Sequence, residues 1–350
     1  MVVMTEVKNG IGWIKINRPK VLNSINLEVV TLMTEALEKW KNDSKILFVC
    51  IYGEGEKGLC AGGDMRKFYD LKDEDVVSYA EDFFATEYHL DALIHHYAKP
   101  IVVYMNGIVM GGGVGLSVGA SHRIVTEKTK WAMPEMNIGF FPDVGASFFL
   151  NQLPGYVGRY LALTARVIKA NDTIYIGAAD YYMESSEWEA IKETWLERKW
   201  SPDSIHQQLD ASIKSNSTSL IETSPLKNLQ KEIDRHFQYE TVEEIIESLQ
   251  GEALKGDGWA AQEVLNLLSK SPTSLKVTLQ QLINGIGKSL DECLEMEKNM
   301  AIHFMGTADF YEGVRAVLVD KDGSPNWVPS RLEGLDSSDI EKYFSIPVKD

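Results

Sequence analysis

Three consecutive glycines, Gly111, Gly112 and Gly113, restrict the folding of this chain more than any other feature of its sequence. They follow an apolar run at 101–105 and precede a small-residue segment at 114–120. Glycine has no Cβ, so three in a row suit a backbone that takes up positive φ or approaches a ligand closely. Backbone N–H groups beside a helix start can also face an anionic oxygen. The sequence therefore predicts a strand, a glycine turn and a helix here.

Two acidic residues follow the glycine cluster inside an otherwise apolar stretch. Glu135 and Asp143 are separated by residues 136–142, which are mostly Met, Ile, Phe and Pro. A carboxylate in such surroundings is either desolvated, with a raised pKa, or paired with a structural partner, and the sequence leaves both open. Amides for an oxyanion, followed by acids among hydrophobic residues, are the groups that acyl transfer or enolate formation requires.

The composition excludes several classes of protein. At 350 residues the chain can form one large domain or two, and its net charge of −16 disfavours nucleic acid and anionic membranes as partners. No apolar run reaches about 18 residues, and the N-terminus does not resemble a signal peptide. The three cysteines are far apart and the seven histidines lack ligand spacing, so neither a disulfide framework nor a metal site is expected. We expect a cytoplasmic protein.

Strands and helices are expected to alternate in the first half of the chain. Residues 2–7 and 11–16 are apolar-rich runs joined by Asn9-Gly10, the strongest short signal for a β-hairpin. Apolar residues at helical spacing predict a helix over 27–40. The further expected elements are a buried strand at 46–52, a glycine-rich loop at 53–63 and a helix at 73–99. This alternation predicts parallel α/β units with right-handed crossovers.

The second half of the sequence has a helical character. The expected helical segments are 154–165, 172–179, 187–216, 241–268 and 275–304, with a Ser/Thr-rich link at 215–224 and a break at Ser271-Pro272. The sequence therefore predicts an α/β core, residues 1–185, and a mostly helical portion, residues 186–350. We expect the helical portion to pack on the core, most simply within one structural domain.

A second glycine loop, CAGGD at 60–64, follows an expected strand and precedes an expected helix. Alone it is more simply a tight turn, but an oxyanion hole commonly takes two donors from separate segments. The run 115–119 matches the G-x-S-x-G nucleophile elbow. Because three glycines precede it, Ser117 is expected inside the helix and not at the sharp turn that an elbow requires. The cluster also lacks the full dinucleotide-binding pattern.

These segments resemble the crotonase (enoyl-CoA hydratase/isomerase) superfamily. The matching motifs are CAGGD at 60–64, NGIVMGGGVGLS at 106–117, MPE at 133–135 and EGVRA at 312–316. Within the superfamily the chain is most similar to the 3-hydroxyisobutyryl-CoA hydrolases, through AMPEMNIGFFPDVG at 132–145, SPTSLK at 271–276 and DFYEGVRAVLVDKDGSPNW at 309–327. The resemblance covers roughly residues 11–327. It implies an α/β spiral of ββα units with a helical C-terminal portion.

The resemblance also implies roles for individual residues. The backbone N–H groups of Gly63 and Gly112 would form an oxyanion hole for the thioester oxygen of an acyl-CoA. Glu135 falls at the position of the family's catalytic glutamate, and Asp143 stands where hydratases typically carry glycine and the hydrolase branch carries aspartate. Glu87 matches a substrate-contacting glutamate of that branch; from its context alone it would be a solvated residue or an ion-pair partner.

Hydratases supply a second catalytic glutamate just after the glycine cluster, and here that position is Gly115. The resemblance therefore implies hydrolysis of a short 3-hydroxyacyl-CoA thioester, most specifically 3-hydroxyisobutyryl-CoA in valine breakdown. CoA would be part of the substrate, with no separate cofactor, and Lys20 and Arg18 are candidates to hold its phosphates. A homo-oligomer is compatible with the resemblance, since trimers are common in the superfamily. The alternatives are an enoyl-CoA hydratase or isomerase, and a non-catalytic acyl-CoA-binding or assembly protein.

Overall fold

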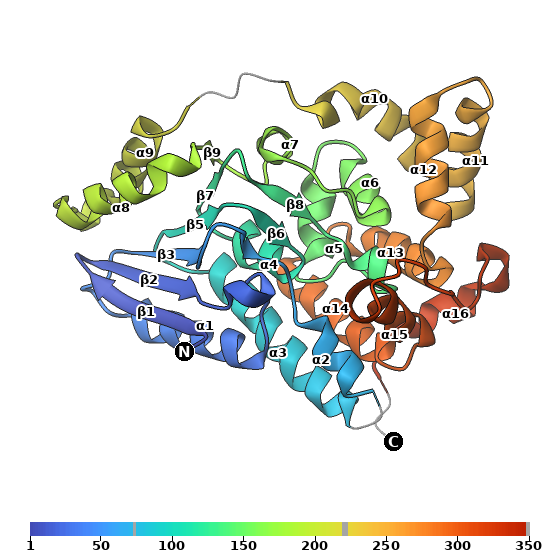
Figure 1. The fold of residues 1–350 in the computed structure, drawn as a ribbon, viewed down its shortest axis with the longest axis horizontal. Coiled ribbons are helices and arrows are strands. Elements are labelled where there is room, and N and C mark those ends of the chain that lie inside the picture. Colours follow the sequence, from blue (N-terminus) through green and yellow to red (C-terminus); the bar gives the residue numbers. More distant parts are fainter. Residues whose placement is uncertain (73–74, 219–222, 348–350) are drawn as a thin grey trace. The chain divides into compact units, whose positions relative to one another are not determined.

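The computed structural model describes residues 1–72, 75–218 and 223–347 (Figure 1). The chain forms two compact units, each assembled from three separate segments. Unit 1 comprises Met1–Gly63, His89–Ala132 and Val167–Asn228, and unit 2 comprises Asp64–Tyr88, Met133–Arg166 and Leu229–Asp350. Two helices, α3 (Val76–His95) and α10 (Pro225–Phe237), continue from one unit into the other. The division of the chain at residue 185 stays a prediction.

Both sheets formed by the described residues belong to unit 1. The larger sheet has the strand order β1-β2-β3-β5-β7-β9 and the smaller one β4-β6-β8. All their pairings are parallel except that of β1 with β2, which confirms the parallel α/β units. The strands are β1 (Val3–Lys8), β2 (Ile11–Ile16), β3 (Phe48–Gly53), β4 (Gly58–Cys60), β5 (Ile101–Met105), β6 (Ile108–Met110), β7 (His122–Val125), β8 (Lys130–Ala132) and β9 (Tyr181–Tyr182). The helices wholly within unit 1 are α1 (Leu27–Lys41), α4 (Gly112–Val118), α7 (Ala170–Tyr175), α8 (Trp188–Glu197) and α9 (Ile205–Ser215).

The predicted hairpin is confirmed. Asn9 and Gly10 have φ values of 51° and 76°, the left-handed pair that a two-residue turn between antiparallel strands needs. The helix predicted over 27–40 is also confirmed by α1. Asn26 caps its start, because the Asn26 side chain accepts a hydrogen bond from the N–H of Val29.

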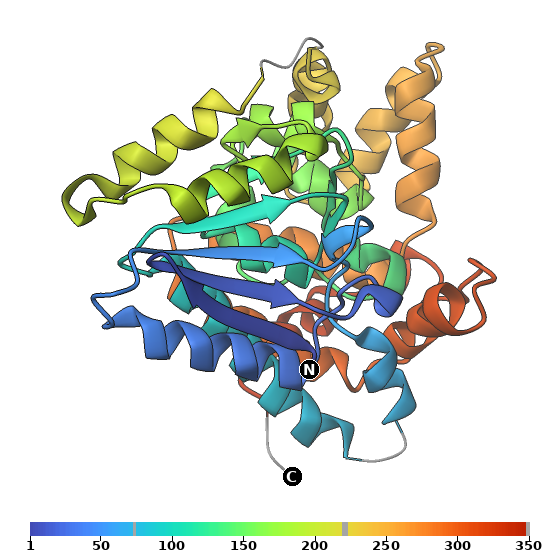
Figure 2. The same cartoon turned by 60° about the vertical axis from the view of Figure 1, so that its left-hand side comes forward.

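Helices cover both faces of the six-stranded sheet in unit 1 (Figures 1 and 2). Trp13 on β2 contacts the ring of Trp195 on α8, and the same buried cluster includes Leu209 on α9. Neighbouring residues of a strand face opposite ways, so Gly12 faces the other side of the sheet. There a Cβ would lie 2.5 Å from the ring of Trp40 on α1, so glycine at this position leaves room for the helix.

The loop predicted over 53–63 is wrong in part, because Gly58–Cys60 forms β4. A strand of three residues in a glycine-rich segment is too short to show an alternating pattern. Strand β4 is stabilised by distant partners: the N–H of Leu59 donates to the carbonyl of Asn106 at 3.0 Å, and β4 pairs with β6.

Unit 2 is built from helices among the described residues. They are α2 (Met65–Asp70), α5 (Ala146–Phe149), α6 (Val157–Thr164), α11 (Val242–Ala253), α12 (Gly258–Leu268), α13 (Pro272–Gly285), α14 (Leu290–Phe304), α15 (Ala308–Val314) and α16 (Ser337–Glu341). The long helix α3 confirms the prediction for 73–99, whose residues 73–74 lie outside the described ranges. No helix in the ranges described is long and apolar enough to cross a membrane.

Three longer helical segments predicted from the sequence are interrupted. Segment 187–216 divides into α8 and α9 around Pro202, segment 241–268 into α11 and α12 at Gly256-Asp257, and segment 275–304 into α13 and α14 at Gly287. Proline and left-handed glycine both end helices. Figure 1 shows α11 and α12 as an antiparallel pair. Residues 219–222 of the predicted Ser/Thr-rich link lie outside the described ranges.

Candidate active site

The two predicted glycine loops lie close together in unit 1. A Cβ placed on Gly62 would lie 3.7 Å from the backbone nitrogen of Gly112. The φ values of Gly62 and Gly111 are 104° and 50°, so both turns favour glycine. Strand β4 leads into the first loop and β6 into the second, and these strands pair in parallel, which brings both loops to the same end of the small sheet.

The backbone donors of these loops are not all occupied. The N–H of Gly62 donates to Sγ of Cys60 at 3.3 Å. Gly112 is the first residue of α4, and a first-turn N–H has no acceptor within its own helix. Throughout the described part of the chain, the N–H groups of Gly63 and Gly112 donate to no other group. Two such amides in adjoining loops are what an oxyanion hole requires.

Ser117 lies inside α4, as predicted, and not at its entrance. Its hydroxyl donates to the carbonyl of Val114 at 2.9 Å and is fully buried. The structure therefore excludes the nucleophile-elbow interpretation of residues 115–119.

In unit 2, Glu135 and Asp143 are both buried, with 6% and 3% of their surface exposed. Glu135 opens a short 3₁₀ turn, Glu135–Ile138, and Asp143 precedes α5. Oδ2 of Asp143 accepts a hydrogen bond from the hydroxyl of Tyr88 at 2.9 Å. Oε2 of Glu135 has no hydrogen-bond partner among the described residues. One carboxyl group is thus anchored, and the other keeps an oxygen that is not used for structure.

Burial raises the pKa of both carboxyl groups. For Glu135 the loss of hydration is the main cause, and the neighbouring charge of Asp143 raises the pKa further. For Asp143 burial again dominates, while the hydrogen bond from Tyr88 lowers the pKa in part. Because each charge disfavours ionisation of the other, the two groups titrate as a coupled pair.

A cluster of buried aromatic side chains in unit 2 reaches Asp143 through Tyr88. The ring of Phe84 lies 5.6 Å from that of Tyr88 and 6.0 Å from that of Phe140, and Phe140 contacts Phe141 at 4.5 Å between ring centroids. The rings of Phe84, Phe140 and Phe141 are fully buried. Tyr88, whose hydroxyl bonds Asp143, belongs to this aromatic cluster, so the carboxyl group of Asp143 adjoins buried rings and not water.

The segments that carry the family resemblance also support the Glu135 turn. Gly313 of EGVRA packs so closely against Ile138 that a Cβ would overlap its backbone. Ser271 of SPTSLK donates to Asp309 at 2.6 Å, and the N–H of Val328 donates to the other oxygen of Asp309 at 2.7 Å. These motifs therefore have a structural task in addition to any chemical one.

The sequence did not identify two further residues of this carboxyl cluster, Tyr88 and Glu297. Tyr88 follows the predicted Glu87 directly on α3, and both are buried, but a lone tyrosine on an aromatic-rich helix gives no signal. Glu297 lies on α14, and its charge contributes to the raised pKa of Glu135. Nothing in its local sequence distinguishes it from a solvated glutamate.

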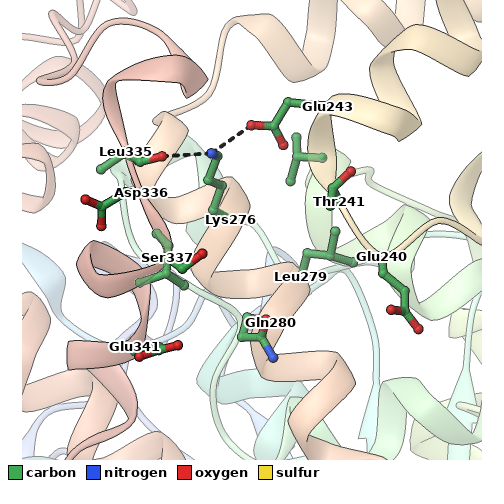
Figure 3. Close-up of a pocket in the computed structure, with 12 residues that line it drawn as sticks. Glu240, Thr241, Glu243, Lys276, Leu279, Gln280, Leu335, Asp336, Ser337 and Glu341 are labelled. Atoms are coloured by element: carbon green, nitrogen blue, oxygen red, sulfur yellow. Dashed lines mark hydrogen bonds and ion pairs between the residues drawn. The ribbon is translucent and has the colours of Figure 1, made fainter.

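A pocket of about 400 Å³ lies elsewhere in unit 2, between the start of α11, α13 and the segment around α16 (Figure 3). Nζ of Lys276 lies there, 2.7 Å from Oε1 of Glu243 and 3.1 Å from the carbonyl oxygen of Leu335. None of the predicted site residues lines this pocket.

The parallel sheets and the glycine loops of unit 1 are those expected of an α/β protein of the crotonase class. A family model described as enoyl-CoA hydratase/isomerase matches residues 11–344. The chain therefore belongs to the enoyl-CoA hydratase/isomerase family, and the predicted crotonase-like fold is confirmed. A crystal structure of a carnitinyl-CoA dehydratase from Mycobacterium thermoresistibile is similar to it with a TM-score of 0.90 and 35% identity, over 99% of this chain and 97% of that one.

Two relatives of similar identity have different names. The 3-hydroxyisobutyryl-CoA hydrolase, mitochondrial, of Danio rerio is 41% identical over 98% of this chain and 89% of its own length. The small ribosomal subunit protein mS47 of Neurospora crassa is 38% identical over 95% of this chain and 69% of its own length. Since the hydrolase is named a mitochondrial protein, the expected cytoplasmic location stays a prediction.

Replacing Tyr88 by Phe tests the anchoring of Asp143. The hydrogen bond from Tyr88 lowers the pKa of Asp143, so Tyr88→Phe should raise that pKa above its wild-type value. The measurement is a ¹³C NMR titration of the carboxyl carbon, assigned by comparison with Asp143→Asn. Tyr311→Phe is a matched control, because the Tyr311 hydroxyl donates to the carbonyl of Met305. A pKa of Asp143 that is unchanged or lower in Tyr88→Phe would contradict the assignment.

Proposed function

We propose that this protein hydrolyses short 3-hydroxyacyl-CoA thioesters, with 3-hydroxyisobutyryl-CoA as the first substrate to test. The observation that carries the proposal is the buried pair of Glu135 and Asp143, in which Asp143 occupies a position where hydratases typically have glycine. The sequence similarity to the zebrafish hydrolase supports the same substrate.

The proposed reaction begins at the thioester carbonyl. The N–H groups of Gly63 and Gly112 stabilise the charge that develops on its oxygen, each contributing about 2.7–4 kcal/mol in comparable sites. Glu135 either attacks the carbonyl carbon, giving a mixed anhydride that water then opens, or removes a proton from the attacking water. In both routes the C–S bond breaks and the products are the 3-hydroxy acid and CoA.

Asp143 has three candidate tasks in this reaction. It can accept a hydrogen bond from the 3-hydroxyl of the substrate, orient Glu135, or donate a proton to the departing thiolate. Its raised pKa suits proton donation, because a carboxyl group that is protonated near neutral pH can act as an acid. Glu87 is proposed as a further substrate contact.

A hydratase is the alternative enzyme. The similarity to a dehydratase structure is the specific observation that favours it. Water addition by two carboxylates would need an acid just after the glycine cluster. This chain has Gly115 there, buried inside α4, where its N–H donates to the carbonyl of Gly111 at 3.2 Å. The absence of an acid at position 115 supports hydrolysis over water addition.

A second candidate function is that of an assembly protein without catalysis, and the similarity to mS47 favours it. The net charge of −16 opposes direct binding to ribosomal RNA. A protein without catalysis would also have no use for a buried Glu135 carboxyl group with an unpartnered oxygen, because burying a polar atom without a hydrogen bond is costly. The hydrolase therefore remains the better supported proposal.

Two assays on one preparation test the proposed function. A thiol reagent should detect CoA released from 3-hydroxyisobutyryl-CoA, while crotonyl-CoA should lose little of its double-bond absorbance. Because Glu135 must be ionised and its pKa is raised, the rate should still be rising with pH where an exposed glutamate is already fully ionised. Efficient hydration without CoA release would assign the protein to the hydratases, and CoA-ester binding without turnover would favour the assembly function.

Substrates with and without the 3-hydroxyl separate the tasks of the two carboxyl groups. Glu135→Gln should lower kcat at least about 100-fold on both substrates and leave KM nearly unchanged. Asp143→Asn should lower kcat/KM about 10- to 100-fold on the hydroxylated substrate, as expected for a hydrogen bond to a charged group, and much less on the other. Equal fractional losses on both substrates would mean that Asp143 does not contact the hydroxyl.

A further inference from the structure

A third buried carboxyl group, that of Glu297, binds the segment that follows Asp143. Glu297 lies on α14 and has no exposed surface. Oε2 accepts a hydrogen bond from the N–H of Gly145 at 2.7 Å. Oε1 accepts from the N–H and the hydroxyl of Ser147, at 2.8 Å and 2.6 Å. Glu297 therefore binds the residues two and four positions after Asp143.

Gln281 on α13 holds the same segment on the other side of Asp143. Its Nε2 donates to the carbonyl of Pro142 at 2.6 Å and to Oγ of Ser147 at 2.9 Å. The same nitrogen lies 3.3 Å from Oε1 of Glu297. The backbone is therefore fixed on both sides of Asp143: at Pro142 by α13 and at Gly145 by α14.

The turn between these points has an unfavourable backbone conformation. Val144 has a φ of 54°, in the left-handed region that β-branched residues avoid, and Gly145 follows with a φ of 87°. Such a conformation persists only where the surrounding contacts over-determine it. The N–H of Gly145, which Glu297 binds, belongs to this turn. Without that acceptor a buried N–H would lose its partner, and the turn would lose the contact that holds it.

We propose that Glu297 is a positioning residue for Asp143: it holds the Val144-Gly145 turn in its left-handed form and so fixes the direction of the Asp143 carboxyl group toward Tyr88. Where the inference concerns catalysis it rests on the proposed function, but the positioning itself does not require that function. No part of the role demands that Glu297 touch the substrate.

Glu297 also acts on the cluster through its charge. The ionisable groups facing it are Asp143 in the turn, Glu135 in its 3₁₀ turn, Tyr88 on α3 and Cys293 on α14 itself. Burial raises the pKa of Glu297 to about 7, and the donors on Ser147 and Gly145 lower it in part. Its charge in turn raises the pKa of Glu135. A neutral residue in its place should lower that pKa.

Glu297→Gln tests the inference, because it keeps the shape but replaces one acceptor oxygen by a donor. Misplacing Asp143 should lower kcat about 10- to 100-fold with KM within about threefold, and should move the acid limb of the pH–rate profile to lower pH. Glu263→Gln is the matched control. Glu263 is an equally buried glutamate of unit 2 on α12, bonded to the hydroxyl of Tyr160 at 3.1 Å. The control should keep both kcat and the acid limb within about twofold of wild type.

A crystal structure of Glu297→Gln provides a readout that needs no activity. Val144 should leave the left-handed region, and the distance between the Tyr88 hydroxyl and Asp143 should exceed that of a hydrogen bond. An unchanged turn and an unchanged Tyr88–Asp143 contact would overturn the inference, even if the wild-type protein released no CoA and the proposed function failed.

If Glu297→Gln does not fold, Ser147→Ala replaces it as the test, since it removes the hydroxyl that donates to Oε1 of Glu297 and accepts from Gln281, and leaves the Glu297 side chain in place. Ser147→Ala should lower kcat several-fold and move the acid limb of the pH–rate profile to lower pH, by less than Glu297→Gln does. Wild-type kcat and an unshifted limb in folded Ser147→Ala would overturn the inference.

Discussion

The burial of three carboxyl groups in unit 2 is the constraint on which the rest of the site depends. Glu135, Asp143 and Glu297 lose their hydration on burial, so each carboxylate must be matched by donors or remain protonated. Tyr88 supplies a donor to Asp143, and the backbone at Gly145 and Ser147 supplies donors to Glu297. Of these three carboxyl groups, that of Glu135 has a buried oxygen without a partner among the described residues, and this oxygen is the one that the proposed reaction uses.

The same demand explains why glycines stand at particular positions. Gly145 allows the turn after Asp143 to present its N–H to Glu297, with a φ of 87° that other residues rarely adopt. Gly139 and Gly313 allow the Glu135 turn and α15 to approach backbone to backbone. In unit 1, Gly62 and Gly113 do the same for the two loops that carry the unused N–H donors. Glycine is thus placed where backbone must approach backbone.

Much of the fold could be predicted because its signals are local. Asn9-Gly10 predicts a left-handed turn, the apolar spacing from Leu27 predicts α1, and three preceding glycines place Ser117 inside a helix. What could not be predicted depends on distant partners. Strand β4 exists because β6 pairs with it, and Glu297 joins the cluster although it lies 154 positions beyond Asp143 in the sequence. Helix-period patterns also continue through a left-handed glycine such as Gly287, so the interruption between α13 and α14 was missed.

The most direct test of this account is the titration of Glu135 itself. A ¹³C NMR titration of the glutamate carboxyl carbons, with Glu135 assigned by comparison with Glu135→Gln, measures the pKa that burial raises. Glu135 should remain protonated well above the pH at which exposed glutamates ionise, and its midpoint should fall when Asp143 is replaced by Asn. A midpoint near about 4.3, the ordinary value for an exposed glutamate, would contradict the account, whatever substrate the protein is found to use.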